Sequence, residues 1–233
     1  MIGFCVFSSK RCGLIPPAPL WKSTPGDADA SRWALILTMM QNKLAVPLGK
    51  IIIINGPSSS GKTTLALALQ KQLEIPFIRF SFDLFIDHKA FPSEQIKSGK
   101  FSWERMRPFV FRGLHQCLPA LATAGNNVIF DHIIETKAWL YELISLISEL
   151  DVFFVGLHCS LAELERREIQ RGDRRPGEAR QDFETVHSIP TYDLELDSEN
   201  PLDGNVTLLI QAWRARKHPS ALEKMIEEMN LPE

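Results

Sequence analysis

The chain has few cysteines and no long apolar run, and both shortages exclude classes of protein. Its 233 residues include four cysteines, at positions 5, 12, 117 and 159, and none of them forms a metal-type CxxC pair. We therefore expect free thiols in a reducing compartment, and hence a cytoplasmic protein. No apolar run approaches the length of a membrane span. A secretory signal is not expected either, because the basic residues Lys10 and Arg11 follow the apolar segment 1–7 instead of preceding it.

A strong charge of either sign is also absent. The formal net charge is −2, which gives no reason to propose nucleic acid or an anionic membrane as the main partner. Hydrophobic residues make up 45% of the chain, which is ample for a core. The length fits one α/β domain with an appendage.

The appendage is expected at the N-terminus. Prolines at positions 16, 17, 19 and 25 and a glycine at 26 are typical of disorder through residue 30. Met39 and Met40 lie shortly before the first expected strand. We expect residues 1–45 to be a disordered extension or an upstream start read into the chain, and residues 46–233 to form the domain.

Residues 56–63 read GPSSSGKT, which is the pattern of a phosphate-binding loop. An apolar strand at 50–55 precedes the loop and a segment rich in helix formers follows at 64–73. The glycines let backbone N–H groups surround an anion, and the helix N-terminus adds a positive partial charge. Lys62 would reach the β- and γ-phosphates of ATP, and the Thr63 hydroxyl would bind Mg²⁺. A plain turn between strand and helix has no use for this pair. The predicted nucleotide-binding residues are Gly56, Pro57, Ser58, Ser59, Ser60, Gly61, Lys62, Thr63 and Thr64.

Strands and helices alternate after residue 50, which favours an α/β fold with a parallel sheet and helices on both faces. Further strands are predicted at 76–80, 127–131, 151–158 and 192–197, with helices over 109–121, 139–150, 161–170 and 221–229. The section 84–107 lacks strand character and is predicted to be a substrate-binding excursion. Residues 161–180 are predicted to be a lid.

Two aspartates follow predicted strands. Asp131 closes the third strand, where a carboxylate can hold Mg²⁺ directly or through water, although it could instead cap the next helix. Asp83 lies at the carboxyl end of the second strand, where doubly wound sheets bind ligands. There it can accept the proton of a substrate hydroxyl that attacks the γ-phosphate. The alternatives are that Asp83 caps the following helix and that Asp87 is the base.

Five arginines gather within the predicted lid, at positions 166, 167, 171, 174 and 175. Such a cluster is often a solvated helix face, here paired with the glutamates at 163, 165 and 168. The functional interpretation is that the arginines fold over the triphosphate, and that Arg171 and Arg174 contact phosphate while Arg166 lies at the surface. The six histidines show no metal-ligand spacing, and His132 is interpreted as a structural neighbour of Asp131.

The chain resembles the chloramphenicol phosphotransferase-like P-loop kinases. The resemblance rests on four stretches that occur in the family's order and together span roughly residues 48–215. They are 51–62 (IIIINGPSSSGK), 82–86 (FDLFI), 128–131 (VIFD) and, most specifically, 155–197, which contains VGLHC, RE, RGDR, VH and YDLELD.

This resemblance implies a doubly wound parallel five-stranded sheet of order 2-3-1-4-5 and transfer of a phosphoryl group from ATP, with Mg²⁺, to a hydroxyl of a small molecule. Asp83 falls on the family's catalytic base, while Arg167, Arg171 and Arg174 fall on its lid arginines. The section 84–107, which would line the acceptor pocket, does not match the antibiotic-modifying enzyme closely. Chloramphenicol or a related antibiotic is therefore one candidate acceptor among others.

Two other functions fit the same phosphate machinery. One is a zeta-toxin-like kinase that acts on a nucleotide sugar, which would use the same loop and a similar base. The other is a nucleotide-dependent switch without an acceptor, which would hydrolyse nucleotide slowly and bind its partner only in one nucleotide state.

Overall fold

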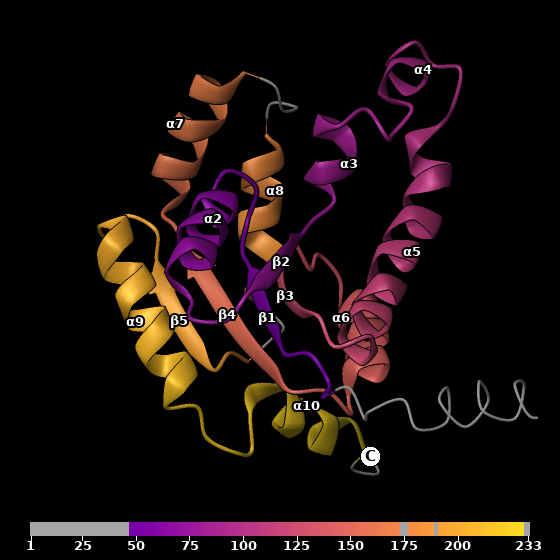
Figure 1. Ribbon diagram of the computed structural model, residues 1–233. Coiled ribbons are helices and arrows are strands. Elements are labelled where there is room, and N and C mark those ends of the chain that lie inside the picture. Colours follow the sequence, from indigo (N-terminus) through magenta and orange to yellow (C-terminus); the bar gives the residue numbers. More distant parts are fainter. Residues whose placement is uncertain (1–46, 173–176, 189–190, 231–233) are drawn as a thin grey trace, which may run out of the picture. The chain divides into compact units, whose positions relative to one another are not determined.

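A parallel five-stranded sheet forms the centre of the domain (Figure 1). The computed structural model describes residues 47–172, 177–188 and 191–230, so the predicted extension 1–45 lies outside the described residues. The strand order is β2-β3-β1-β4-β5 with every pair parallel, which confirms the predicted topology. The strands are β1 (Ile51–Asn55), β2 (Phe77–Phe80), β3 (Asn127–His132), β4 (Val152–His158) and β5 (Leu194–Asp197).

Helices connect consecutive strands and follow the last one. They are α2 (Lys62–Gln72), α3 (Asp83–Asp87), α4 (Ser93–Lys97), α5 (Trp103–Thr123), α6 (Lys137–Ile147), α7 (Leu161–Arg171), α8 (Glu178–Thr185), α9 (Leu202–Arg214) and α10 (Ala221–Asn230). Among the helices of the described residues, none combines the length and the apolarity that crossing a membrane requires.

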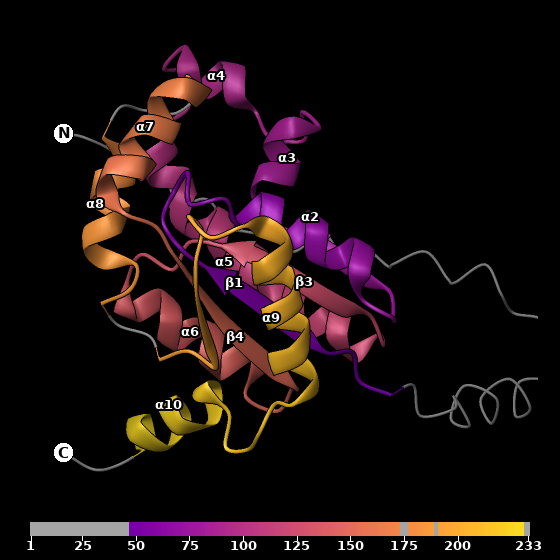
Figure 2. The ribbon, with the colours of Figure 1, turned by 90° about the vertical axis from the view of Figure 1, so that its left-hand side faces the viewer.

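The four isoleucines of β1 explain why the sheet is covered on both faces. All four are at most 1% exposed, and successive side chains of a strand point to opposite faces. Ile51 and Ile53 contribute to one core cluster, together with side chains of α5, α6 and α10. Ile52 and Ile54 contribute to the other, together with side chains of α2 and α9. Figures 1 and 2 show these two helix groups on opposite sides of the sheet.

The section 84–107 contains helices that the sequence pattern did not predict. Helices α3 and α4 are only five residues long and neither contains a buried residue, so no apolar periodicity marks them. Helix α5 begins at Trp103, six residues before the predicted start. The Ser102 side chain caps it by accepting a hydrogen bond from the Arg105 amide at 3.3 Å.

The lid region also differs from its prediction. Helix α7 runs from Leu161 to Arg171 as expected, and Gly172 ends it with a φ of 68°. A second helix, α8, follows at Glu178, although its sequence is too polar to show an apolar stripe. Two helices follow β5: α10 corresponds to the helix predicted over 221–229, and α9 precedes it.

Candidate functional site

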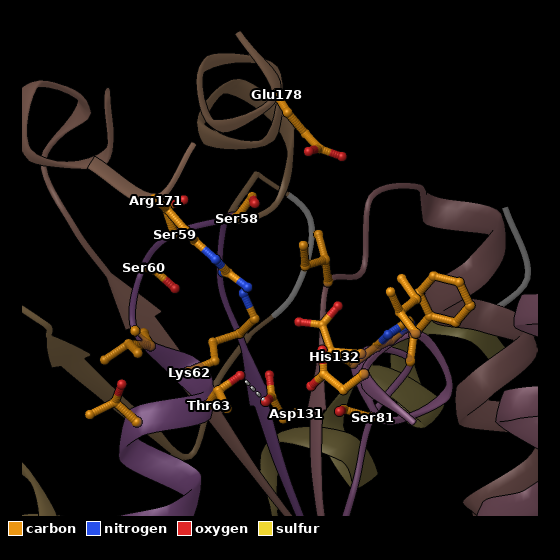
Figure 3. Close-up of a pocket in the computed structure, with 18 of the residues that line it drawn as sticks. Ser58, Ser59, Ser60, Lys62, Thr63, Ser81, Asp131, His132, Arg171 and Glu178 are labelled. Atoms are coloured by element: carbon orange, nitrogen blue, oxygen red, sulfur yellow. Dashed lines mark hydrogen bonds between the residues drawn. The ribbon is translucent and has the colours of Figure 1, made fainter. Parts of the chain in front are cut away.

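A cavity of about 950 Å³ opens at the carboxyl ends of the parallel strands. This volume lies near the upper end of the range for small-molecule sites, so the cavity has room for two substrates. Its lining brings together residues 58–63 of the phosphate loop (residues 56–63), both strand-end aspartates and two of the lid arginines. Figure 3 shows the part around the loop.

Glycine is required at two positions of the phosphate loop. Gly61 has a φ of 94°, a conformation that L-residues rarely adopt, and α2 begins immediately after it. A Cβ atom on Gly56 would lie 2.5 Å from the carbonyl oxygen of Leu157 on the neighbouring strand β4. The loop therefore turns tightly from β1 into α2 and places the helix N-terminus at the cavity.

Lys62 and Thr63, the first residues of α2, lie beside Asp131 in the cavity (Figure 3). The Lys62 Nζ donates a hydrogen bond to the Pro57 carbonyl oxygen at 2.7 Å, across the loop. The Thr63 hydroxyl donates to Asp131 Oδ2, also at 2.7 Å. Two segments that are 68 residues apart thus form the predicted pair of Mg²⁺-binding side chains.

Asp131 is a buried carboxylate at the end of β3. Burial raises its pKa and the charge of Asp83 acts in the same direction, whereas the charges of Lys62 and Arg79 and the Thr63 hydrogen bond lower it. The Nη1 of Arg79 lies 3.5 Å from Asp131 Oδ2 and donates to the Ser81 hydroxyl at 3.1 Å. The sequence analysis missed Arg79, although a cation in an otherwise apolar strand was a signal for it.

Thr63 and Asp131 fit a magnesium ion that is shared with a nucleotide. Hydroxyl and carboxylate oxygens are the ligands that Mg²⁺ prefers. The described residues contain no group of three or more His, Cys, Asp or Glu that could hold a metal by themselves. Phosphate oxygens and water would therefore have to complete the coordination, as is usual for Mg²⁺ in nucleotide sites.

Asp83 and Asp87 occupy the two ends of helix α3. Phe82 is the N-cap of α3, so Asp83 lies in its first turn and does not have the capping role considered as the alternative. Both aspartates line the cavity, but they differ in burial: Asp83 is half-buried, whereas Asp87 is exposed. The charge of Asp83 also acts on Asp131. Asp83 is therefore the better-placed candidate for the base.

The described lid arginines have separate environments. Arg167 donates from Nη1 to the Ser60 carbonyl oxygen of the phosphate loop at 3.1 Å and to the Ser198 hydroxyl at 3.0 Å. Arg171 lines the cavity, and Figure 3 shows its side chain extending over the loop. Arg166 is 60% exposed and paired with Glu163, as expected of a surface residue. Arg174 lies outside the described residues.

Within the described part of the chain, the hydrogen bonds of Glu168 go to backbone amides and not to an arginine. It is buried, and its two carboxylate oxygens accept hydrogen bonds from the amides of Gly177 and Ala179, each at 2.9 Å. Asp182 of α8 is buried as well and accepts from the Ser58 amide of the phosphate loop at 2.8 Å. The sequence analysis missed Asp182, because a contact across 124 residues has no local signal.

Aromatic side chains from within the section 84–107 and from the residues around it form one part of the cavity wall. We call Phe82, Phe91, Trp103 and Phe111 the aromatic wall; the centroids of the contacting rings are 5.2–5.6 Å apart in four of their pairs. Each offset or edge contact adds about 0.5–1.5 kcal/mol beyond simple burial. Nearby, Arg107 forms an ion pair with Glu135 inside the same lining.

Two histidines meet beneath the cavity. The Nε2 atoms of His115 and His132 lie 3.0 Å apart, and His132 also stacks on Phe130. Burial lowers the pKa of both imidazoles, most strongly that of His132, so both are neutral at pH 7. His132 is thus a structural neighbour of Asp131, as interpreted, but it also lines the cavity.

A family model described as chloramphenicol phosphotransferase-like protein matches residues 49–213. The chain belongs to the chloramphenicol phosphotransferase-like family. Two relatives come from Mycobacterium tuberculosis, "Putative O-phosphotransferase Rv2636" of strain H37Rv and "Putative O-phosphotransferase MT2714" of strain CDC 1551. Each is 31% identical over 202 residues, which cover 77% of this chain and 89% of the relative.

Solved structures place this member of the family among the P-loop kinase folds. The APS kinase CysC of Mycobacterium tuberculosis, in complex with AMPPNP and APS, aligns with a TM-score of 0.55 and 19% identity, over 72% of this chain and 99% of that one. Shikimate kinase from Bacteroides thetaiotaomicron aligns with a TM-score of 0.51 and 16% identity, over 71% and 98%. At these identities the likeness establishes the fold.

Proposed function

We propose that the protein is an ATP-dependent O-phosphotransferase that moves the γ-phosphoryl group, with Mg²⁺, to a hydroxyl of a small molecule. The observation that supports this most directly is the position of Asp83. It lines the same cavity as Lys62 and the bonded pair Thr63 and Asp131, and its neighbour in sequence, Phe82, belongs to the aromatic wall. A carboxylate that shares one cavity with the phosphate loop and the aromatic wall suits a proton transfer that accompanies phosphoryl transfer.

In this mechanism the phosphate loop and Lys62 hold the triphosphate. Asp83 takes the proton of the acceptor hydroxyl while that oxygen forms a bond to the γ-phosphorus. The bond from this phosphorus to the β–γ bridging oxygen breaks, and ADP leaves. The magnesium ion, held by Thr63 and Asp131, would neutralise phosphate charge. Arg167 and Arg171 would stabilise charge that develops on the transferred group.

The aromatic wall favours an acceptor with an apolar ring system. A nucleotide sugar would need cations for a second diphosphate, whereas the two cations that the described residues contribute to this side of the lining are already paired, Arg107 with Glu135 and Lys97 with Glu94. An alcohol with an aromatic ring, such as chloramphenicol, would instead stack against Trp103 and its neighbours. The side of the cavity opposite the phosphate loop thus supports a small-molecule acceptor over a nucleotide sugar or a switch without acceptor.

Mass spectrometry tests the proposal. The purified protein is incubated with ATP, Mg²⁺ and chloramphenicol, and Lys62→Ala is the blank. A product one phosphoryl group heavier, absent from the blank, is the expected result. Formation of ADP without that product would retain the kinase chemistry and direct the screen to other ring-bearing alcohols. Nucleotide binding without turnover across such a screen would favour the switch.

A further inference from the structure

Two buried carboxylates lie next to the proposed machinery without belonging to it. Glu168 is on α7, beside the lid residue Arg167, and Asp182 is on α8. They are 8% and 5% exposed. Burying a carboxylate is costly unless hydrogen bonds satisfy its oxygens, so the partners of each side chain show what it stabilises.

Glu168 connects helix α7 to helix α8. Its two oxygens accept hydrogen bonds from the amides of Gly177 and Ala179, which belong to the N-terminal end of α8. The first amides of a helix lack partners inside the helix, and a carboxylate there also matches the positive end of the helix dipole. Glu168 therefore fixes α8 relative to the helix that bears Arg167 and Arg171.

Asp182, in the middle of α8, connects this helix to the phosphate loop. Its Oδ2 accepts a hydrogen bond from the Ser58 amide at 2.8 Å. The charged groups that face it are Lys62 of α2, Glu135 after β3 and Glu178 of its own helix. The Ser58 amide is therefore held by a carboxylate, near the point where the loop leaves β1.

We propose that Asp182 is a positioning residue for triphosphate binding, which holds the Ser58 amide in place and, through Glu168, couples the phosphate loop to the arginine-bearing helix α7. We call Glu168 and Asp182 the carboxylate bridge. The inference rests on the proposed function only in assuming that the loop binds a nucleoside triphosphate. It requires neither an acceptor nor turnover.

The charge of Asp182 leads to a measurable consequence. Burial raises the pKa of this carboxyl to about 6, with the Ser58 amide and Lys62 acting in the opposite direction. A triphosphate in the loop adds negative charge nearby and raises the pKa further, so Asp182 takes up a proton when the nucleotide binds near pH 6. The uptake is larger for a triphosphate than for ADP, because the γ-phosphate adds charge.

Isothermal titration calorimetry at pH 6, in two buffers of different ionisation enthalpy, measures both affinity and proton uptake. The probes are the β,γ-imido analogue of ATP and ADP, each with Mg²⁺. The variants are Asp182→Ala and Asp182→Asn, and the control is Glu184→Gln, which removes a carboxylate from an exposed position of the same helix. The ionisation of the nucleotides themselves is the same for every variant and cancels in the comparison.

We expect Asp182→Ala to weaken binding of the imido analogue about tenfold, because the Ser58 amide loses its partner. Asp182→Asn retains an oxygen that can accept this bond, so its affinity stays within about threefold while the extra proton uptake disappears. Glu184→Gln resembles the wild type in both measurements. If Asp182→Ala does not fold, Asp182→Asn and its proton count decide the question.

Unchanged affinity in Asp182→Ala, or unchanged proton uptake in Asp182→Asn, would overturn the inference and leave the proposed function intact. A wild-type protein that binds neither nucleotide would overturn the proposed function first, and the inference with it. The two failures are therefore distinguishable in a single series of titrations.

Discussion

We assign the phosphate loop and Asp131 to the nucleotide side of the cavity, and the aromatic wall with helices α3 and α4 to its acceptor side. These two sides are built in opposite ways. On the nucleotide side, the loop extends from β1, whose five residues are all buried, and Asp131 is the last but one residue of β3, which pairs with β1 in the sheet. On the acceptor side, α3 and α4 are short helices without a single buried residue. The proposed phosphate-binding residues are thus attached to strands of the buried core. The proposed acceptor side is instead built from short helices without buried residues, whose sequence can vary without unfolding the domain.

The difference follows from what each side has to do. Phosphate binding depends on backbone amides in fixed positions, and a strand that is hydrogen-bonded on both sides holds them. An acceptor is recognised by side chains, which need only a surface that supports them. The core cluster that contains Ile51 and Ile53 supports the aromatic wall, because Phe111 belongs to this cluster and Phe82 and Trp103 pack against it. Substitutions on the two sides should therefore have different consequences.

The largest effect is expected from Asp83→Asn, which changes the proposed catalytic base at the start of α3. The variant lacks the base, so phosphoryl transfer should fall by about 10²–10⁴-fold. Nucleotide affinity should stay within about threefold, since the proposed role of Asp83 is to take the proton of the acceptor hydroxyl and not to hold the triphosphate. Steady-state kinetics with the acceptor found by mass spectrometry, together with titration of the imido analogue, measure both quantities.

Asp87→Asn is the matched control, because it removes a carboxylate from the other end of the same helix. Its transfer rate should remain within about threefold of the wild type, as is usual for a charge that takes no part in the chemistry. Equal loss in the two variants would mean that α3 positions the acceptor and that Asp83 is not the base.

A second contrast concerns stability. Phe130→Ala removes a fully buried ring from β3 and should lower the free energy of unfolding by about 3–5 kcal/mol. Ile96→Ala, in α4 on the acceptor side, should lower it by less than about 1 kcal/mol, because this side chain is only partly buried. Urea denaturation followed by circular dichroism measures both. A comparable loss for Ile96→Ala would show that the acceptor side belongs to the cooperative core.

The same contrast explains what the sequence could predict. The isoleucine run, the GPSSSGKT loop and the apolar strands that end at Asp131 and at Phe80, just before Asp83, are local patterns. The sheet and the position of the phosphate loop were therefore predicted from them. Helices α3, α4 and α8 have no apolar stripe and went undetected. Asp182 could not be assigned, because its partner Ser58 is 124 residues away and only the fold brings them together.

A smaller and more selective effect is expected from Trp103→Ala. Trp103 contacts Phe82 and Phe91 in the aromatic wall. Its loss removes a ring on which the acceptor could stack, and such a contact contributes about 1–1.5 kcal/mol to binding. The KM for a ring-bearing acceptor should rise about tenfold, while the KM for ATP stays unchanged.

The control should be an aromatic residue outside the cavity. Trp213→Ala is a poor control because this ring is buried in the core cluster that contains Ile52 and Ile54. Phe101→Ala, an exposed aromatic near the start of α5, is the better one. A rise in both KM values for Trp103→Ala would indicate a general loosening of the cavity.

The smallest effect is expected from acidification, and it tests the polar support of the nucleotide side. Asn55, at the end of β1, donates to the Tyr192 hydroxyl at 2.8 Å, and His187 Nδ1 lies 2.8 Å from the same oxygen. Burial lowers the pKa of His187 to about 4, from 6.5 for an exposed histidine. Between these values the unfolded chain binds the proton and the folded chain does not, so the stability that neutral His187 contributes is complete above pH 6.5 and is lost as the pH falls towards 4.

In His187→Gln this contribution is absent at every pH. The difference in unfolding free energy between wild type and variant should therefore shrink by about 1–2 kcal/mol from pH 7 to pH 4, a value that allows for the partial exposure of the ring. Denaturant titrations of both proteins at several pH values measure it. A constant difference would mean that His187 titrates as in the unfolded chain, and that the network of Asn55 and Tyr192 supports the phosphate loop without help from a neutral imidazole.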